Sequence, residues 1–516
     1  MTENGPPETR VIAENNLESD NYDGVVLVSH PGQEIQTEKL KTAVETALKY
    51  DPSLKTEIVI LPLSYPAGRL VHVPTGPLDP DYDDVRVFKE CARKGIKRAL
   101  KAGMRRPLLV LEDNSTFINA DLVTLLGALE ALYTPIQVRE HNPCLKQKVT
   151  HLGVYTKDPK KTESLVNMAN VLEAGRRVAC DIGDADPERM SPPNVEAYLT
   201  SVFKDTCISM NVVKDLSEIE KDYPLFEAVN RAAKQQERHQ GRIVFLEYNP
   251  AGPGPVKETV YLVGKGVTYD TGGADIKVGG SMLGMSRDKC GAAAVAGFMC
   301  TVAKLQPQDV KFVAGLSLVR NSVGSNSYVA DEVITARSGA RVRIINTDAE
   351  GRMVMADVLC KFKEAALDAV NPHLFTVATL TGHAVRTVGD GYSIIIDNGP
   401  ARKEGNAQKM QIASELIGDP IEISTLRRED ISNHKGQAEG DDVVQGQAKP
   451  STMSNRGHQG PMAFLLMASG LDKHGSGSEK PLKYSHLDIA ASAGDCPNPA
   501  TGAPILALAK NYLFLK

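Results

Sequence analysis

The chain has 516 residues, more than one ordinary hydrophobic core holds, so several domains are predicted. Hydrophobic residues make up 42% of it and charged residues 24%, as in soluble globular proteins. The net charge of −5 gives no support to a nucleic-acid or anionic-membrane partner, because such partners attract basic proteins. No apolar run approaches the roughly 20 residues that cross a bilayer.

The cysteines and the N-terminal residues both indicate where in the cell the protein is found. The eight cysteines are scattered, and several lie inside apolar runs, which favours buried thiols over a disulfide framework. Residues 1–21 are polar and acidic, lack the features of a signal peptide, and are predicted to form a disordered tail. A cytoplasmic protein is therefore expected.

Strands and amphipathic helices alternate from residue 22 to about 160, which predicts an N-terminal α/β domain. The strands are expected at 22–30, 57–63, 68–75, 106–113 and 148–156. The helices between them are expected at 37–50, 84–103 and 119–133. A helical connector over 161–190 is predicted to follow.

The remaining residues, 191–516, are predicted to form a larger C-terminal domain. Its apolar strands are expected at 241–248, 258–266, 310–319, 340–348, 373–382 and 484–492. Several are nearly continuous apolar runs, which is typical of strands buried on both faces. The fold class predicted is α/β, with a mostly parallel central sheet flanked by helices, and ligands are expected at the carboxyl ends of its strands. Residues 434–460 form a long polar stretch, which is usually functional or mobile.

The heptapeptide "NTDAEGR", residues 346–352, places Asp348, Glu350 and Arg352 between an expected strand and an expected helix. A second polar segment supplies Lys265, Asp270, Lys277 and Asp288. Taken singly, each has an ordinary interpretation: a helix cap for Asp288, a turn for Asp270 and a solvent-exposed position for either lysine.

Taken together, these carboxylates predict a metal site. Four converging carboxylates repel one another, and divalent cations relieve the conflict. None of the eleven histidines stands at ligand spacing from another, so the ligands would be carboxylates, which suit Mg²⁺ or Mn²⁺ and are also accepted by Zn²⁺.

The whole pattern resembles the leucyl aminopeptidase (cytosol aminopeptidase) family of dinuclear metallo-aminopeptidases. The resemblance is carried by the spacing of the two lysines and two aspartates, by "NTDAEGR", and by "ATLTG", "SHLDIA" and "ATGAP". It covers roughly residues 240–516 and implies that 191–516 is a catalytic dinuclear metallopeptidase domain. The implied reaction is hydrolysis of the N-terminal residue of peptides with a free N-terminus by a water that bridges two metals.

The resemblance also implies a role for each site residue. Asp270 and Glu350 would bridge two divalent ions (Zn²⁺ or Mn²⁺, with Mg²⁺ as a further candidate), and Asp348, Lys265 and Asp288 would be further ligands. Lys277 would polarise the scissile carbonyl, and Arg352 would hold a bicarbonate ion that shuttles a proton. The implied substrate-binding residues are Met285, Asn346, Thr379, Leu380 and Gly382. A homohexamer is implied as well.

Departures from the family pattern keep other interpretations open. Segment 434–460 lacks the family's usual sequence, and Asp275 is an extra carboxylate that could form an outward salt bridge or dampen Lys277. The alternative is a metal-binding, catalytically weak family member with a scaffold role. A two-metal phosphoesterase is less favoured, because a lysine ligand and the lack of clustered histidines do not suit it.

Overall fold

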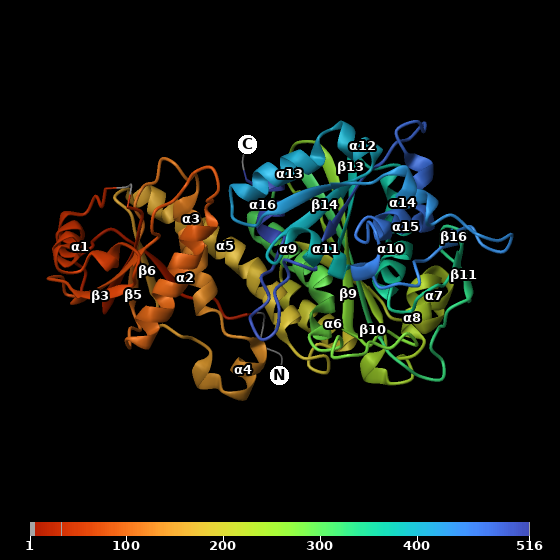
Figure 1. The fold of residues 1–516 in the computed structure, drawn as a ribbon, viewed down its shortest axis with the longest axis horizontal. Helices are drawn as coiled ribbons and strands as arrows, with labels where there is room; N and C mark the ends of the chain where they lie inside the picture. The colour runs from red at the N-terminus through yellow and green to blue at the C-terminus, as the bar shows by residue number, and fades with distance from the viewer. Residues whose placement is uncertain (1–5, 32–33, 515–516) are drawn as a thin grey trace. The chain divides into compact units, whose positions relative to one another are not determined.

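The computed structural model describes residues 6–31 and 34–514, and these divide into two compact units (Figure 1). One unit comprises Pro7–Ala174 with Glu415–Gly418, and the other comprises Gly175–Ser414 and the chain from Asp419 onward. Helix α5 (Pro159–Asp184) covers most of the predicted connector. The predicted domain limits at 160 and 190 stay predictions. No helix in the described ranges combines the length and apolarity that crossing a membrane requires.

The first unit contains a six-stranded sheet in the order β1-β6-β5-β2-β4-β3, parallel except for the β3–β4 pair. Its strands are β1 (Val11–Glu14), β2 (Gly24–Ser29), β3 (Val59–Pro62), β4 (Arg69–Pro74), β5 (Pro107–Val110) and β6 (Leu152–Tyr155). Its helices are α1 (Glu38–Tyr50), α2 (Arg86–Lys101), α3 (Ala120–Leu132) and α4 (Ile136–His141). Each strand and helix predicted within 22–156 is present.

The prediction of a disordered tail over residues 1–21 is wrong for its described part. Val11–Glu14 pairs in parallel with Leu152–Tyr155 at the edge of the sheet. This short strand is only half-buried and ends in a glutamate, so the sequence gives it none of the apolar density that marked the other strands. Residues 1–5 lie outside the described chain.

The second unit is built on an eight-stranded sheet in the order β15-β14-β17-β13-β9-β10-β8-β7. Its strands are β7 (Ile208–Val213), β8 (Arg242–Tyr248), β9 (Glu258–Asp270), β10 (Val310–Asn321), β13 (Pro372–Ala378), β14 (Ser393–Asp397), β15 (Ile421–Thr425) and β17 (Lys483–Asp488). The central strands β17, β13, β9 and β10 run parallel, while the β10–β8, β8–β7 and β14–β17 pairs are antiparallel. The predicted α/β class with a mostly parallel central sheet is confirmed.

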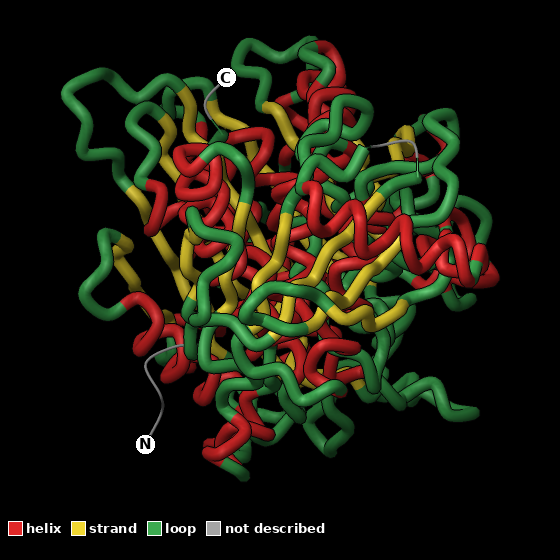
Figure 2. Tube along the Cα trace, turned by 90° about the vertical axis from the view of Figure 1, so that its left-hand side faces the viewer, coloured by secondary structure: helices red, strands yellow, loops and turns green. Residues whose placement is uncertain are grey.

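Helices cover both faces of this sheet (Figures 1 and 2). On one face lie α6 (Pro192–Phe203), α9 (Cys290–Leu305) and α16 (Ile505–Tyr512), and on the other lie α8 (Pro224–Asn230), α10 (Glu350–Ala366) and α15 (Gly460–Ser469). The structure also contains α7 (Leu216–Asp222), α11 (Gly382–Val388), α12 (Gly399–Lys403), α13 (Asn406–Glu415) and α14 (Arg428–Ser432). Because β9 and β13 are covered on both faces, their side chains are almost all buried.

The strand predicted at 340–348 is wrong in length and in place. Only Arg341–Arg343 forms a strand, β12, and it belongs to a separate three-stranded sheet with β11 (Val333–Thr335) and β16 (Val443–Val444). One further backbone bond continues the β11–β12 register, from Ile344 N–H to the carbonyl of Glu332, and the next N–H, that of Ile345, donates to a glutamine side chain instead. The turn at 346–349 is therefore held by side chains rather than by a long strand.

Candidate metal centre

The twelve site residues predicted from the sequence converge on one cavity of about 450 Å³ in the second unit. Strand β9 contributes Lys265 and ends at Asp270, and a glycine-rich loop then carries Lys277. A 3-10 turn over Met285–Lys289 carries Asp288, and α10 begins at Glu350. The lining includes Lys265, Asp270, Lys277, Met285, Asp288, Asn346, Asp348, Glu350, Arg352, Thr379, Leu380 and Gly382.

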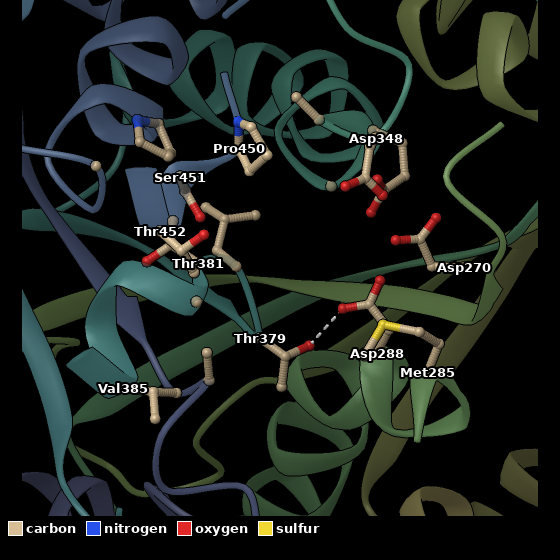
Figure 3. A pocket seen from close by; sticks show the side chains of 18 of the residues that line it. Asp270, Met285, Asp288, Asp348, Thr379, Thr381, Val385, Pro450, Ser451 and Thr452 are labelled. Atoms are coloured by element: carbon tan, nitrogen blue, oxygen red, sulfur yellow. Dashed lines mark hydrogen bonds between the residues drawn. The ribbon is translucent and has the colours of Figure 1, made fainter. Parts of the chain in front are cut away.

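Three buried carboxylates form the centre of the site. Asp270, Asp288 and Glu350 each offer an oxygen, and these oxygens lie within 4.8 Å of one another. Figure 3 shows Asp270, Asp288 and Asp348 directed from separate elements towards a common space. Asp288 Oδ2 and Glu350 Oε2 are buried and have no hydrogen-bond partner within the part of the chain that the structure describes. Buried carboxylate oxygens without donors are unfavourable, so this arrangement suits a cation.

Two lysines bridge these carboxylates. The ammonium of Lys265 lies 2.7 Å from Asp288 Oδ1 and 3.0 Å from Glu350 Oε1, and it donates to the carbonyl of Thr379 at 3.0 Å. Lys277 Nζ lies 2.9 Å from Asp270 Oδ2 and 2.5 Å from Asp348 Oδ1. Burial alone would lower the pKa of both lysines, but the surrounding carboxylates hold each pKa above its usual value.

The carboxylates themselves are held towards their neutral forms. Burial, followed by the charge of Asp270, raises the pKa of Asp348 to about 6 and raises the pKa of Glu350 well above its usual value. Burial also raises the pKa of Asp288. Two lysines therefore do not compensate the negative charge in full, and a bound divalent cation would favour all of these carboxylates in their ionised form. The donor set fits oxygen-ligated metals.

Arg352 lies in the first turn of α10, is 9% exposed, and lines the same cavity. Its Nη1 donates to the carbonyl of Gln445 at 3.0 Å, while its Nε has no partner among the described residues. Burial lowers its pKa to about 10, so the guanidinium stays charged at neutral pH. A buried cationic donor with an unused N–H is suited to a small anion.

The turn between β12 and α10 is clamped on one side by Asp275. Its Oδ2 accepts from Thr347 N–H at 2.7 Å, and its own N–H donates to Thr347 Oγ1 at 2.8 Å. These hydrogen bonds give Asp275 a function beyond the two considered from the sequence, an outward salt bridge and an electrostatic effect on Lys277: it fixes the backbone next to Asp348.

Asn321 also supports the ligand residues and was not predicted. It pairs with Asp270 in the β10–β9 register, and its Nδ2 donates to Asp270 Oδ1 at 2.8 Å and to the carbonyl of Thr347 at 3.1 Å. A polar residue ending the apolar run 310–319 was a usable signal, because ligands gather at such strand ends.

The predicted substrate-binding residues form part of the cavity wall. Thr379 Oγ1 donates to Asp288 Oδ1 at 2.9 Å (Figure 3), and Asn346 Oδ1 accepts from Asp348 N–H at 2.8 Å, so both shape ligand positions directly. Leu380 N–H and Thr381 Oγ1 donate to the buried Asp488, which joins "ATLTG" to "SHLDIA".

The family resemblance implied that the segment 434–460 borders the substrate pocket, but its lining residues were not named from the sequence. Pro450, Ser451 and Thr452, from the segment 434–460, line the cavity together with Val385 (Figure 3). The segment therefore borders the space in which a substrate would lie.

Comparison with known proteins identifies the family of this chain. The sequence profile of the "Cytosol aminopeptidase family, catalytic domain" matches residues 177–509. A Caenorhabditis elegans protein named "Putative aminopeptidase W07G4.4" is 46% identical over 97% of both chains. A Vibrio cholerae protein named "Cytosol aminopeptidase" is 29% identical over 68% of this chain and 64% of its own.

The solved structure titled "Bottromycin maturation enzyme BotP in complex with Mn" shares the fold, with a TM-score of 0.77 and 22% identity over 95% of this chain and 98% of its own. The family resemblance predicted from the sequence is thereby confirmed. This chain belongs to the cytosol aminopeptidase family, whose members are metallopeptidases.

Proposed function

We propose that this chain is a dinuclear metal-dependent aminopeptidase that removes the N-terminal residue of peptides. The observation that carries the proposal is the buried group of Asp270, Asp288 and Glu350, whose oxygens lie within 4.8 Å of one another in a cavity open to a substrate. Family membership supports the same reaction class.

Two divalent ions would be held by Asp270 and Glu350 as shared ligands, with Asp348, Asp288 and neutral Lys265 completing the set. When bound, such ions lower the pKa of a water and polarise a carbonyl group. Lys265 would then have to lose its proton, which a neighbouring dication favours, whereas the carboxylates alone keep it protonated. Mn²⁺ and Zn²⁺ are the preferred candidate ions, and Mg²⁺ is a further candidate because it also binds oxygen ligands.

Two cationic side chains, Lys277 and Arg352, would assist the hydrolysis. Lys277, 2.9 Å from Asp270, is positioned to donate to the substrate carbonyl oxygen as negative charge develops on it. Arg352, whose Nε–H has no partner among the described residues, would hold a bicarbonate ion, which would supply a base for the proton of the attacking water. Asp288 Oδ2 would accept a hydrogen bond from the free α-amine of the substrate.

The cavity wall supports an apolar first side chain. Met285, Leu380, Val385 and Pro450 contribute apolar surface, and Gly382 contributes no side chain. The scaffold alternative is not favoured, because all predicted ligands are present and adjoin one cavity. The homohexamer and the cytoplasmic location stay predictions from the family resemblance.

A peptide pair with and without a free amine tests the proposal. The full chain is stripped of metal, reloaded with Mn²⁺ or Zn²⁺, and given a Leu-initiated dipeptide or its N-acetylated twin. Metal-dependent release of leucine from the free-amine peptide alone is expected, since an acetyl group removes the basic nitrogen. Equal cleavage of both peptides, or no cleavage by the folded, metal-loaded chain, would contradict the proposal.

A further inference from the structure

Gln445 lies in the segment 434–460, whose sequence departs most from the family pattern. It directly follows β16, which pairs in parallel with β12, and its backbone N–H donates to the carbonyl of Arg343 at 2.8 Å. Its side chain is 0% exposed. The amide is thus placed among backbone groups that water does not reach.

The Gln445 amide makes four hydrogen bonds to the turn that carries the metal-site carboxylates. Its Oε1 accepts from the N–H groups of Ile345 at 3.1 Å and Asn346 at 3.0 Å. Its Nε2 donates to the carbonyls of Asn346 at 2.8 Å and Ala349 at 3.1 Å. A primary amide offers two N–H donors and a two-lone-pair acceptor, so the whole capacity of this side chain is used on one turn.

The backbone of Gln445 reaches the far end of the same turn, because its carbonyl accepts from Arg352 Nη1 at 3.0 Å. One residue therefore contacts the turn before Asp348, between Asp348 and Glu350, and at Arg352. No strand or helix holds residues 344–349 in place, because β12 ends at Arg343 and α10 begins only at Glu350. A glutamine from another part of the chain supplies the hydrogen bonds that a longer strand would have made.

We propose that Gln445 is a positioning residue for the metal centre, which it serves by holding the turn 345–349 so that Asp348 and Glu350 face the same ions. This inference rests on the proposed function, because it gives the turn its metal-binding purpose. It also assigns a use to the unusual segment: β16 and Gln445 anchor it to the ligand turn, and its next residues continue into the cavity wall. Groups that orient metal ligands in this way affect affinity by about 10–100-fold.

The test compares Gln445→Leu, which keeps the side chain's bulk and removes its hydrogen bonds, with Gln437→Leu. Gln437 is an exposed glutamine of the same segment, so its replacement controls for the loss of a polar side chain. Mn²⁺ binding to the stripped full-length proteins is measured calorimetrically, and hydrolysis of a free-amine dipeptide is measured at saturating Mn²⁺. For Gln445→Leu, the Kd for Mn²⁺ should rise about 10–100-fold and kcat should fall, with little change in KM. Gln437→Leu should match the unchanged protein.

A second variant separates positioning from folding. In Gln445→Glu, one carboxylate oxygen can still accept from Ile345 and Asn346, but the other faces two carbonyls that had received N–H groups. Protonation of this glutamate restores a donor. The Kd ratio of Gln445→Glu to the unchanged protein should therefore be large at pH 8 and smaller at pH 6.

Three results would overturn the positioning role of Gln445, and a fourth would overturn the proposed function. Unchanged Kd and kcat in both Gln445 variants would overturn the positioning role, and so would loss of fold in both variants, which would make the residue purely structural. A Gln445→Glu ratio that does not change with pH would also overturn it. If the unchanged protein itself takes up no metal, the proposed function fails, and this inference fails with it.

Discussion

Replacing Lys277 by methionine separates the electrostatic and chemical functions of this lysine. Lys277 contacts Asp270 at 2.9 Å and Asp348 at 2.5 Å, and its side chain is 14% exposed. In the metal-free chain the variant leaves both carboxylates without this cation. Removing one partner of a buried ion pair costs 3–5 kcal/mol, and the lower end, about 3 kcal/mol, applies here because Asp348 is 31% exposed.

Bound metal should reverse that loss of stability but not the loss of activity. Divalent ions supply the positive charge that the variant lacks, so the melting temperatures of variant and unchanged protein should converge as Mn²⁺ is added. The catalytic rate should stay lower by about 10²–10³-fold, the effect of losing one donor to a developing oxyanion.

Differential scanning fluorimetry with and without Mn²⁺, together with kcat for a free-amine dipeptide, measures both effects. Lys409→Met, at an exposed position of α13, is the matched control. Equal melting temperatures of the metal-free variant and the unchanged protein would refute the electrostatic reasoning. Loss of metal uptake in the variant would show that Lys277 is itself needed to hold the ions.

Two further predictions concern the ligand turn and the effect of pH. Asp275→Ala should weaken Mn²⁺ binding about 10-fold by releasing Thr347, as calorimetry can measure, and unchanged affinity would contradict the clamp. Burial lowers the pKa of His434 and His458 to about 4 and that of His486 to about 3, against 6.5 ordinarily. Between its lowered pKa and 6.5, each of these histidines binds more protons in the unfolded chain than in the folded one. Each therefore lowers the free energy of unfolding as the pH drops from 6.5 towards 4, by up to about 1.4 kcal/mol per pH unit, whereas the raised pKa values of Asp348 and Glu350 act in the opposite direction. Urea unfolding of the unchanged protein and of His458→Gln at pH 7 and pH 5 isolates one histidine: the variant should lose less stability on acidification, and an equal loss in both proteins would contradict the reasoning.

The candidate ligands could be predicted because their signals are local. Asp270 follows a buried apolar run, and "NTDAEGR" concentrates charge between two regular elements. The rule that ligands lie at the carboxyl ends of strands and the family resemblance therefore both indicate the same residues. The central strands were predictable for a related reason, since burial on both faces imposes continuous apolar runs.

The supporting contacts could not be predicted, because they join residues that are far apart in the chain. Gln445 lies about a hundred residues from the turn it braces, and its sequence context does not distinguish it from the exposed Gln437. Asp275 is only two residues from Lys277, which suggested an interaction with that lysine, whereas its partner is Thr347. The strand predicted at 340–348 failed for the same reason: a side chain replaces the backbone partners that a longer strand would need.

Titration of the metal-stripped protein with Mn²⁺ tests the metal centre most directly, with bound metal per chain and hydrolysis of a free-amine dipeptide followed on the same samples. Hydrolysis should be absent without metal and should rise as two ions bind, and Asp348→Ala should lose both the metal and the activity. Full hydrolysis by the stripped chain in the presence of a chelator, or by Asp348→Ala, would contradict the dinuclear mechanism.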